Sequence, residues 1–501
     1  MPAGLPWPAA PLALALLLAL ALLLALCRPL WALRWSLSRD HGCALPLPRG
    51  SMGWPFFGET LHWLLQVRLG GARLRYGNVF KTHLLGRPVV RVTGAENIRK
   101  ILLGEHTLVS AQWPRSTQII LGSHTLLSSI GDLHQQHRKV SILARVFSRA
   151  ALESYLPRIQ KVVSWELRGW CMEPGSIAVY SSAKTLTFRI AAQILLGLRL
   201  EEKKFKELAK TFDQMVENLF SLPLNIPFSG LRKGIKARDM LHKYMEGAIQ
   251  EKLQRNNSED DSDALDFIIN SAKEHGKEFT MQELKVTRLP LYSSPSDLLA
   301  VWVRGRGLRE VPCRATGSCL TFTSTEDTIS SASRKAWTQC ALLCASISLE
   351  KLGRLRYLDG VIKEVLRLLP PVSGGYRTAL QTFELDGCQI PKGWSVMYSI
   401  RDTHETAAVY QSPLSSFDPE RFGAARLEAA GRFHYVPFGG GARSCIGQEL
   451  ARAILKLLAI ELVSTARWEL ATPGYPAMRT VPIVHPGFVG FLPLPFFWFS
   501  G

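Results

Sequence analysis

The sequence predicts a mainly α-helical globular protein with small β-sheets. Several long stretches carry apolar residues at three- and four-residue spacing, which is the period of a helix with one buried face. Residues 78–94 alternate as two short strands do, and residues 374–400 also resemble short strands. With 501 residues, 47% of them hydrophobic, the chain can bury a large core, and we find no internal repeat.

The first element is an uncharged apolar run over residues 9–27. At about 1.5 Å per residue, a helix of this length crosses the ~30 Å hydrocarbon core of a bilayer. A cleaved signal peptide is the alternative, but its apolar run is usually shorter and follows a positive start, and no Lys or Arg precedes this run. We therefore expect residues 1–30 to form an N-terminal transmembrane anchor.

The residues after this run indicate its orientation. Arg28, Arg34 and Arg39 follow it, interleaved with Trp31 and Trp35. Positive charge marks the cytoplasmic side, and tryptophan favours the membrane interface. The pattern predicts a single-pass protein whose following domain is cytoplasmic.

A proline-rich hinge at residues 31–59 leads to the folded body, residues 60–501. The hairpin predicted at 78–94 turns at Gly86. Stretches with helical spacing lie at 99–109, 189–200, 201–220, 264–276, 351–372 and 448–466.

The strongest chemical signal is the segment FGGGARSCIG at residues 438–447. Cys445 directly precedes the predicted helix at 448–466, and a helix N-terminus favours the thiolate form. The glycines allow a ligand to approach the backbone closely, and Arg443 can pair with a carboxylate. Haem has a flat face, an iron that needs an axial ligand, and two propionates. The alternative is a glycine-rich turn that caps a helix beside a buried cysteine.

The pattern F-x-x-G-x-R-x-C-x-G, filled by Phe438, Gly441, Arg443, Cys445 and Gly447, resembles the haem-binding signature of the cytochrome P-450 superfamily. The resemblance implies the cytochrome P-450 fold and a haem b group with Cys445 as the proximal thiolate ligand of iron. It also implies that Phe438 packs near the sulfur, that Arg443 pairs with a propionate, and that the two glycines lie against the cofactor.

Three residues elsewhere resemble the structural Glu-Arg-Arg network of this superfamily. Glu364 and Arg367 are three residues apart in KEVLRLLPP, and Arg421 lies in FDPERF. A Glu-x-x-Arg pair alone is usually a surface pair on a helix, and its position before the cysteine segment is what gives it weight.

Further basic residues resemble the propionate-binding side chains of the superfamily. His134 and Arg138 lie in HQQHRKV, and Arg377 lies in GGYRTAL. A solvated basic helix face is the alternative for the first two.

Longer stretches resemble the retinoic-acid hydroxylases of family 26, most closely subfamily C, over residues 45–285 and 350–485. They include GSMGWPFFGETLHWL, PPVSGGYRTAL and GWSVMYSIRDTHE. The resemblance implies a monooxygenase of the endoplasmic reticulum membrane that hydroxylates all-trans-retinoic acid at C4. Such an enzyme uses O₂ and electrons from NADPH, which a flavoprotein reductase (NADPH-cytochrome reductase) delivers.

A retinoid is an elongated apolar acid, so its pocket needs apolar walls and one cation. The candidate substrate contacts are Trp113, Pro114, Val372, Ser373 and Arg87. Each is equally compatible with an ordinary core or surface position.

The net charge of +19 by itself admits nucleic acid, an anionic membrane or an acidic protein as a partner. The charge is dispersed and no binding motif accompanies it, so we expect no nucleic-acid partner. Residues 219–230 are apolar and broken by prolines, and a basic run over residues 232–238 follows. This segment either dips into membrane lipid or forms a buried loop. The nine cysteines have no zinc-site or disulfide-framework spacing and fit a reducing compartment.

Residues 286–349 and 486–501 depart from family 26. Members of the family carry a long buried helix across the distal haem face, whereas here proline, glycine and arginine break every helical period. A catalytic residue on the distal side is therefore not recognisable. Two hypotheses follow: a retinoic-acid hydroxylase, or a catalytically impaired haem- or retinoid-binding product of a different splice form or gene model.

Overall fold

The computed structural model describes most of the body of the chain. The longer described ranges are 29–55, 75–84, 86–122, 146–173, 176–195, 200–254, 347–406, 417–423 and 433–468, with shorter pieces at 14–15, 22, 26–27, 58–60, 129–131, 134, 197–198, 315–316, 319–320, 409–410, 478–479, 485–486 and 493–498. Within these ranges, no helix is both long and apolar enough to cross a membrane. Most of the run 9–27, in which we expected the anchor, lies outside the described residues.

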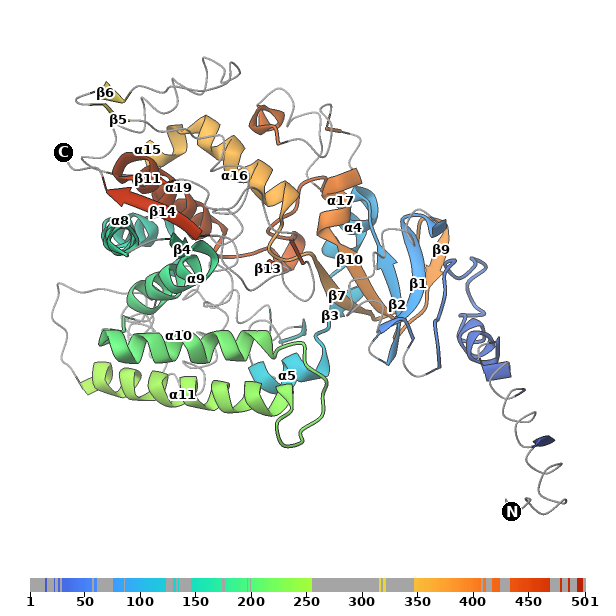
Figure 1. The fold of residues 1–501 in the computed structure, drawn as a ribbon. Helices are drawn as coiled ribbons and strands as arrows, with labels where there is room; N and C mark the ends of the chain where they lie inside the picture. The colour runs from blue at the N-terminus through green and yellow to red at the C-terminus, as the bar shows by residue number, and fades with distance from the viewer. Residues whose placement is uncertain are drawn as a thin grey trace, which may run out of the picture. The chain divides into compact units, whose positions relative to one another are not determined.

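The chain divides into two compact units, the first formed by residues 1–112 and 374–399. Its centre is a five-stranded sheet in the order β1-β2-β10-β7-β3 (Figure 1). The strands are β1 (Val79–Leu84), β2 (Arg87–Val92), β3 (Val109–Ala111), β7 (Gly374–Ala379) and β10 (Ser395–Ser399). β1 and β2 pair antiparallel, with Leu84 opposite Arg87, and Gly86 between them has φ 78°. The predicted hairpin is confirmed.

A helix and a two-stranded pair also belong to this unit. Helix α4 (Ala95–Leu103) follows the hairpin, and β8 (Phe383–Leu385) pairs with β9 (Cys388–Ile390). The helix expected over 99–109 was wrong in its second half: Gly104 ends α4, its N–H bonding to the carbonyl of Lys100, and Val109 begins β3. A glycine at this position stops the helix although the apolar spacing continues.

Aromatic side chains hold residues 31–35 against the sheet of this unit. The rings of Trp31 and Trp35 are 5.5 Å apart, and Trp35 lies 6.2 Å from Trp394. Both tryptophans also contact the ring of His83, on β1. Burial, with the nearby charge of Arg34, lowers the pKa of His83 to about 4, so this histidine is neutral at physiological pH.

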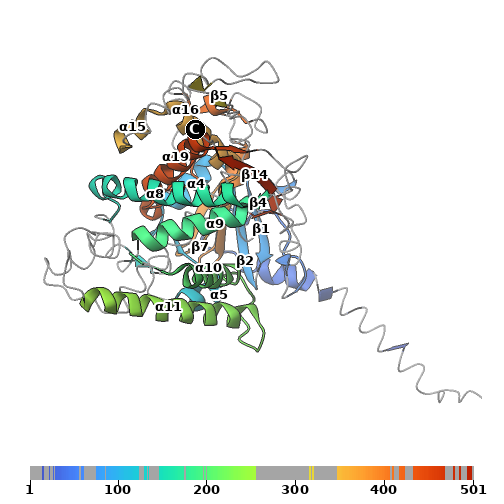
Figure 2. The same ribbon diagram turned by 60° about the vertical axis from the view of Figure 1, so that its left-hand side comes forward.

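The second unit, residues 113–373 and 400–501, is mainly helical. Its first helices are α5 (Arg115–Leu121), α8 (Arg149–Met172), α9 (Val179–Ile190), α10 (Glu202–Glu217) and α11 (Gly230–Gln254). Ser148 caps α8 by accepting a hydrogen bond from the N–H of Ala151. α9 continues as a short π-helix, η1 (Ala191–Leu195), and α10 lies alongside α11 (Figures 1 and 2).

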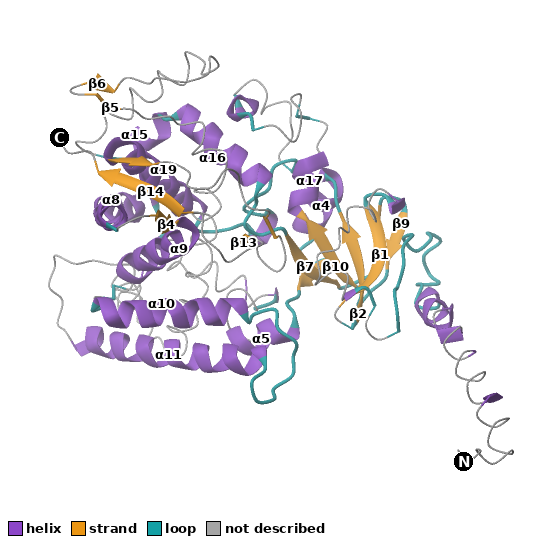
Figure 3. Cartoon of the chain, in the orientation of Figure 1, coloured by secondary structure: helices purple, strands orange, loops and turns teal. Residues whose placement is uncertain are grey.

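The later elements of this unit include the cysteine segment. They are α15 (Leu349–Arg354), α16 (Arg356–Leu368), α17 (Ile400–Thr406), the 3₁₀ turns η3 (Pro419–Phe422) and η4 (Gly441–Arg443), and α19 (Gln448–Thr465). The helix expected over 351–372 is thus two helices that meet at Leu355, whereas the one expected over 448–466 is confirmed as α19. α19 packs against α8, and both contribute to one large apolar core (Figure 3).

A three-stranded sheet in the order β11-β14-β4 lies in the same unit, built from Ala466–Trp468, Pro493–Trp498 and Ser176–Ala178. The middle strand comes from the divergent tail 486–501. Two more two-stranded pairs are described, β5 (Ala315–Thr316) with β6 (Cys319–Leu320) and β12 (Met478–Arg479) with β13 (His485–Pro486). Almost all of residues 286–349, and the helix expected at 264–276, lie outside the described residues. The predicted class, mainly helical with small sheets, is confirmed.

Candidate functional site

The cysteine segment forms a closed loop at the start of α19. The N–H of Cys445 donates to the carbonyl of Phe438 at 2.9 Å, and the N–H of Gly439 donates to the carbonyl of Val436 at 3.0 Å. Gly439 and Gly441 have φ values of 69° and 63°, a region that other residues rarely adopt. The two glycines therefore set the shape of the turn that presents the thiol.

Cys445 is not in a disulfide and is half-buried, and it lies just before the first residue of α19. The first helical hydrogen bond runs from the N–H of Ala451 to the carbonyl of Gly447. A Cβ atom at Gly447 would lie 3.7 Å from the ring of Phe147, in ordinary contact. Unpaired N–H groups at a helix start stabilise negative charge, so the loop places the sulfur where a thiolate is favoured.

A cation of the same loop reaches a second segment of the unit. Nη2 of Arg443 donates to the carbonyl of Ser129 at 2.7 Å. His134 follows five residues later and is 3% exposed. The loop thus lies beside the stretch that carries the predicted propionate-binding histidine, while Arg138 lies outside the described residues.

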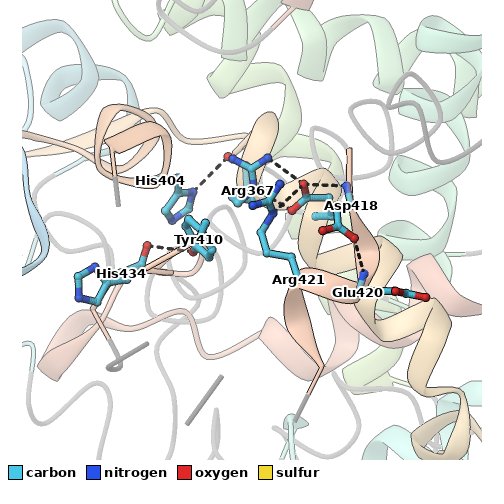
Figure 4. A network of polar contacts seen from close by, with 8 residues as sticks. Arg367, His404, Tyr410, Asp418, Glu420, Arg421 and His434 are labelled. Carbon is cyan, nitrogen blue, oxygen red and sulfur yellow. Dashed lines mark hydrogen bonds and ion pairs between the residues drawn. The ribbon is translucent and has the colours of Figure 1, made fainter. Parts of the chain in front are cut away.

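A buried ionic network lies behind the loop. Glu364 and Arg367, on α16, form two hydrogen bonds of 2.7 and 2.8 Å. Nε of Arg421, on η3, lies 3.3 Å from Oε1 of Glu364, and the N–H of Asp418 donates to the same oxygen at 3.1 Å (Figure 4). The structure therefore brings together the three residues that the sequence motif grouped. All three are buried, and the single carboxylate of Glu364 accepts hydrogen bonds from both guanidinium groups.

One residue that sequence reasoning missed connects this network to the loop. Nε2 of His404, on α17, accepts a hydrogen bond of 2.9 Å from the N–H of Val436. Its Nδ1 lies 3.3 Å from the carbonyl oxygen of Arg367 (Figure 4). Burial is the main reason that the pKa of His404 falls to about 3. The family-26 stretch GWSVMYSIRDTHE contains this histidine but does not indicate its role, because both of its partners are backbone atoms distant in sequence.

Two tyrosines enclose the same region. The guanidinium groups of Arg367 and Arg421 lie 5.6 and 5.4 Å from the ring centre of Tyr410, whose hydroxyl bonds to the carbonyl of His434 at 3.3 Å. The ring of Tyr435 stacks on His404 at 5.3 Å. Burial raises the pKa of Tyr410 to about 12, so its hydroxyl stays protonated.

The candidate substrate contacts fall in both units. Trp113 and Pro114 lie just before α5, and Ser373 accepts hydrogen bonds from the first residues of α17, all in the helical unit. Val372 beside it is 57% exposed. Arg87 is exposed at the start of β2 in the sheet unit.

Arg377 is also in the sheet unit, where it is buried on β7. Its Nε lies 2.8 Å from Oε2 of Glu105, and its Nη1 donates to the carbonyl of Tyr376. Glu105 thus balances the charge of Arg377 within the sheet unit, and the sequence did not indicate this partner.

The residues of the loop fit haem. The donor is a half-buried thiol at a helix start, Arg443 offers a guanidinium to a propionate, and residues 437–448 are half-buried or exposed throughout. Haem needs a polarisable donor to its iron, accessible backbone against its flat face and a cation beside its propionates. The cysteine loop offers the Cys445 thiol, accessible backbone and Arg443 for these needs.

Comparison with known proteins gives the same assignment. The family model described as cytochrome P450 matches residues 48–293 and 338–486. The chain belongs to the cytochrome P450 family. It is 58% identical to cytochrome P450 26C1 of Homo sapiens over 480 residues, which cover 92% of this chain and 91% of that protein. It is 59% identical to cytochrome P450 26C1 of Mus musculus over 480 residues, which cover 92% of this chain and 90% of that protein. It is 53% identical to cytochrome P450 26B1 of Xenopus tropicalis over 470 residues, which cover 91% of this chain and 88% of that protein.

A solved P450 structure supports the fold. The structure described as retinoic acid bound cyanobacterial CYP120A1 matches 91% of this chain and 100% of its own with a TM-score of 0.77 and 30% sequence identity. The predicted P450 fold, family 26 and subfamily C are confirmed, and the chain is a cytochrome P450 enzyme.

Proposed function

We propose that this P450 hydroxylates all-trans-retinoic acid at C4, with haem b held by Cys445. The cysteine loop carries the proposal, because its thiol, glycines and arginine together match the needs of one cofactor. Family 26 membership supports the reaction class, and the likeness to a P450 solved with retinoic acid supports a retinoid as substrate. Haem bound at Cys445 supplies the oxygen-activating chemistry.

The remaining roles in this proposal belong to the side chains around the loop. The helix start before α19 favours the Cys445 thiolate, and Phe438 shields the sulfur from water. Arg443, His134, Arg138 and Arg377 hold the propionates. The Glu364–Arg367–Arg421 network keeps the loop rigid and takes no part in the chemistry.

An apolar carboxylic acid sets the requirements for the substrate contacts. Trp113, Pro114, Val372 and Ser373 supply apolar wall and a polar group, and Arg87 supplies the cation that pairs with the carboxylate. Electrons come from NADPH through a flavoprotein reductase that docks on the protein.

The proposal places the enzyme at the endoplasmic reticulum membrane, with its body in the cytoplasm. The apolar run 9–27 is the proposed anchor. A second contact is proposed between α10 and α11, where Leu222, Leu224, Ile226 and Phe228 are 54–91% exposed and a basic run follows. Apolar side chains beside lysine and arginine suit the headgroup region of a bilayer.

The experiment that tests the cofactor assignment is Cys445→Ala in the full-length protein. The reduced, carbon-monoxide-bound wild type should show the long-wavelength absorption of a thiolate-ligated haem, and the variant should lose it. Cys171→Ala, at a half-buried free cysteine on α8, is the matched control and should keep the band. An unshifted band in Cys445→Ala would overturn the assignment. Incubation with reductase, NADPH and retinoic acid, with product chromatography, tests the substrate.

A second candidate function is a haem- or retinoid-binding protein with impaired turnover. The observation that favours it is the interruption of the family match between residues 293 and 338, where family members carry the distal helix. That helix excludes water and delivers protons, so its loss would leave haem binding intact and would divert electrons to peroxide. Replacing residues 286–349 with the corresponding segment of a family-26 relative should then raise 4-hydroxylation. Equal, coupled turnover before and after the replacement would exclude this candidate.

A further inference from the structure

We propose that His404 is a positioning residue: as a neutral imidazole protonated on Nδ1, it fixes the cysteine loop to the Glu364–Arg367–Arg421 network. This inference rests on the proposed haem-binding role of the loop. It concerns a residue that lies outside the signature motif and whose two hydrogen bonds end on the backbone of Arg367 and Val436.

The hydrogen bonds fix the tautomer of the ring. The backbone N–H of Val436 can only donate, so Nε2 of His404, at 2.9 Å from it, is the acceptor and carries no proton. The carbonyl of Arg367 can only accept, so Nδ1, at 3.3 Å from it, carries the proton and donates. The ring is 0% exposed, and burial keeps it neutral. A positively charged ring would have donors on both nitrogens and would lose the bond to Val436.

The bond reaches the cysteine through two further steps. Val436 accepts at its carbonyl from the N–H of Gly439, where the turn with positive φ begins. Phe438, between them, accepts from the N–H of Cys445. The position of the Val436 peptide therefore sets where the glycine turn starts, and the turn sets where the thiol is presented.

Through Nδ1, the imidazole of His404 binds the backbone of Arg367 in the Glu364–Arg367–Arg421 network. Arg367 uses its side chain to bind Glu364 and its backbone carbonyl to accept from His404. α16, α17 and the loop thus meet at one ring, which also stacks on Tyr435 at an interplanar angle of 22°.

The chemistry of the two bonds defines a matched set of variants. In His404→Gln the carboxamide oxygen can accept from Val436 and its NH₂ can donate to Arg367, so both bonds can persist. In His404→Phe the ring shape and the stack on Tyr435 are kept while both bonds are lost. His83→Phe is the control, because His83 is a similarly buried histidine whose ring contacts Trp31 and Trp35 within the sheet unit.

Two readouts report on position without relying on turnover. Hydrogen exchange, followed by mass spectrometry of peptides covering residues 433–447, measures protection of the Val436 and Cys445 amides in the full-length protein with and without haem. Transfer of haem from the loaded protein to an excess of apomyoglobin measures how firmly the cofactor is held. The bond to Val436 is the one that ends on the loop, and losing it is expected to change each readout by about tenfold, the equivalent of ~1.4 kcal/mol.

His404→Phe should therefore lower loop protection and speed haem transfer by about tenfold, His404→Gln should stay within about threefold of the wild type, and His83→Phe should leave the loop unchanged. Unchanged protection in His404→Phe, or equal loss in the Phe and Gln variants, would overturn the proposal. The exchange measurement without haem tests the role of His404 independently of the proposed haem-binding function. If the chain takes up no haem at all, the proposed function fails, and loop protection still decides the role of His404.

Discussion

Acidification should destabilise this protein through His404, and the effect can be calculated from its surroundings. Burial lowers the pKa of His404 to about 3 in the folded protein, with the nearby Arg367 charge acting in the same direction and the hydrogen bond to the Arg367 carbonyl opposing it. In the unfolded chain the pKa returns to ~6.5. Below that value the unfolded state binds a proton that the folded state excludes, so stability is lost as the pH falls from about 6.5 towards 3.

The magnitude follows from the difference in proton binding. At pH 5 the unfolded histidine is ~1.5 pH units below its pKa, while the folded ring remains neutral. At about 1.36 kcal/mol per unit, the group lowers the free energy of unfolding by about 2 kcal/mol relative to pH 7.5. The ring is fully buried, so solvent screening does not reduce this value substantially.

The assay compares urea unfolding of full-length wild type and His404→Gln at pH 7.5 and pH 5, followed by tryptophan fluorescence. All other titrating groups are shared, so the loss of stability on acidification should be smaller in His404→Gln by about 2 kcal/mol. His404→Phe should show the same reduced pH dependence from a lower starting stability, because it also lacks the titrating group. Equal pH dependence in wild type and both variants would refute the reasoning, since it would mean that His404 titrates alike in the folded and unfolded chains.

Two further predictions concern the buried network and the membrane contact. Arg421→Ala should lower stability by about 1.5–3 kcal/mol, because Glu364 loses one charged hydrogen bond and keeps its two bonds to Arg367. Arg354→Ala, which breaks an exposed pair, should cost at most ~1 kcal/mol. Thermal unfolding checks both, and equal losses would contradict the first. In a variant lacking residues 1–27, Phe228→Asp should reduce flotation with anionic vesicles several-fold, since this side chain is 91% exposed, while unchanged flotation would place the membrane contact elsewhere.

The sequence alone determined the features that depend on neighbouring residues. The spacing around Cys445 identified the cysteine loop and the superfamily, because the loop needs a thiol, glycines and a cation within a few residues of one another. The hairpin β1–β2 was predictable from alternation and from Gly86, and α19 from its apolar spacing. Family 26 was recognisable because long stretches on both sides of residues 286–349 keep its pattern.

Only the tertiary structure decided the contacts between distant segments. β2 pairs in parallel with β10, some three hundred residues later. Both strands bury apolar residues and need a partner for their backbone groups, but neither strand's sequence indicates which strand it will pair with. Arg377 finds Glu105 in the same way. The partners of His404 could not be predicted from the sequence for a clear reason. They are the carbonyl of Arg367 and the N–H of Val436, and every residue except proline carries the same two backbone groups. A side chain that recognises backbone leaves no complementary residue in the sequence, so only the folded chain shows what it binds.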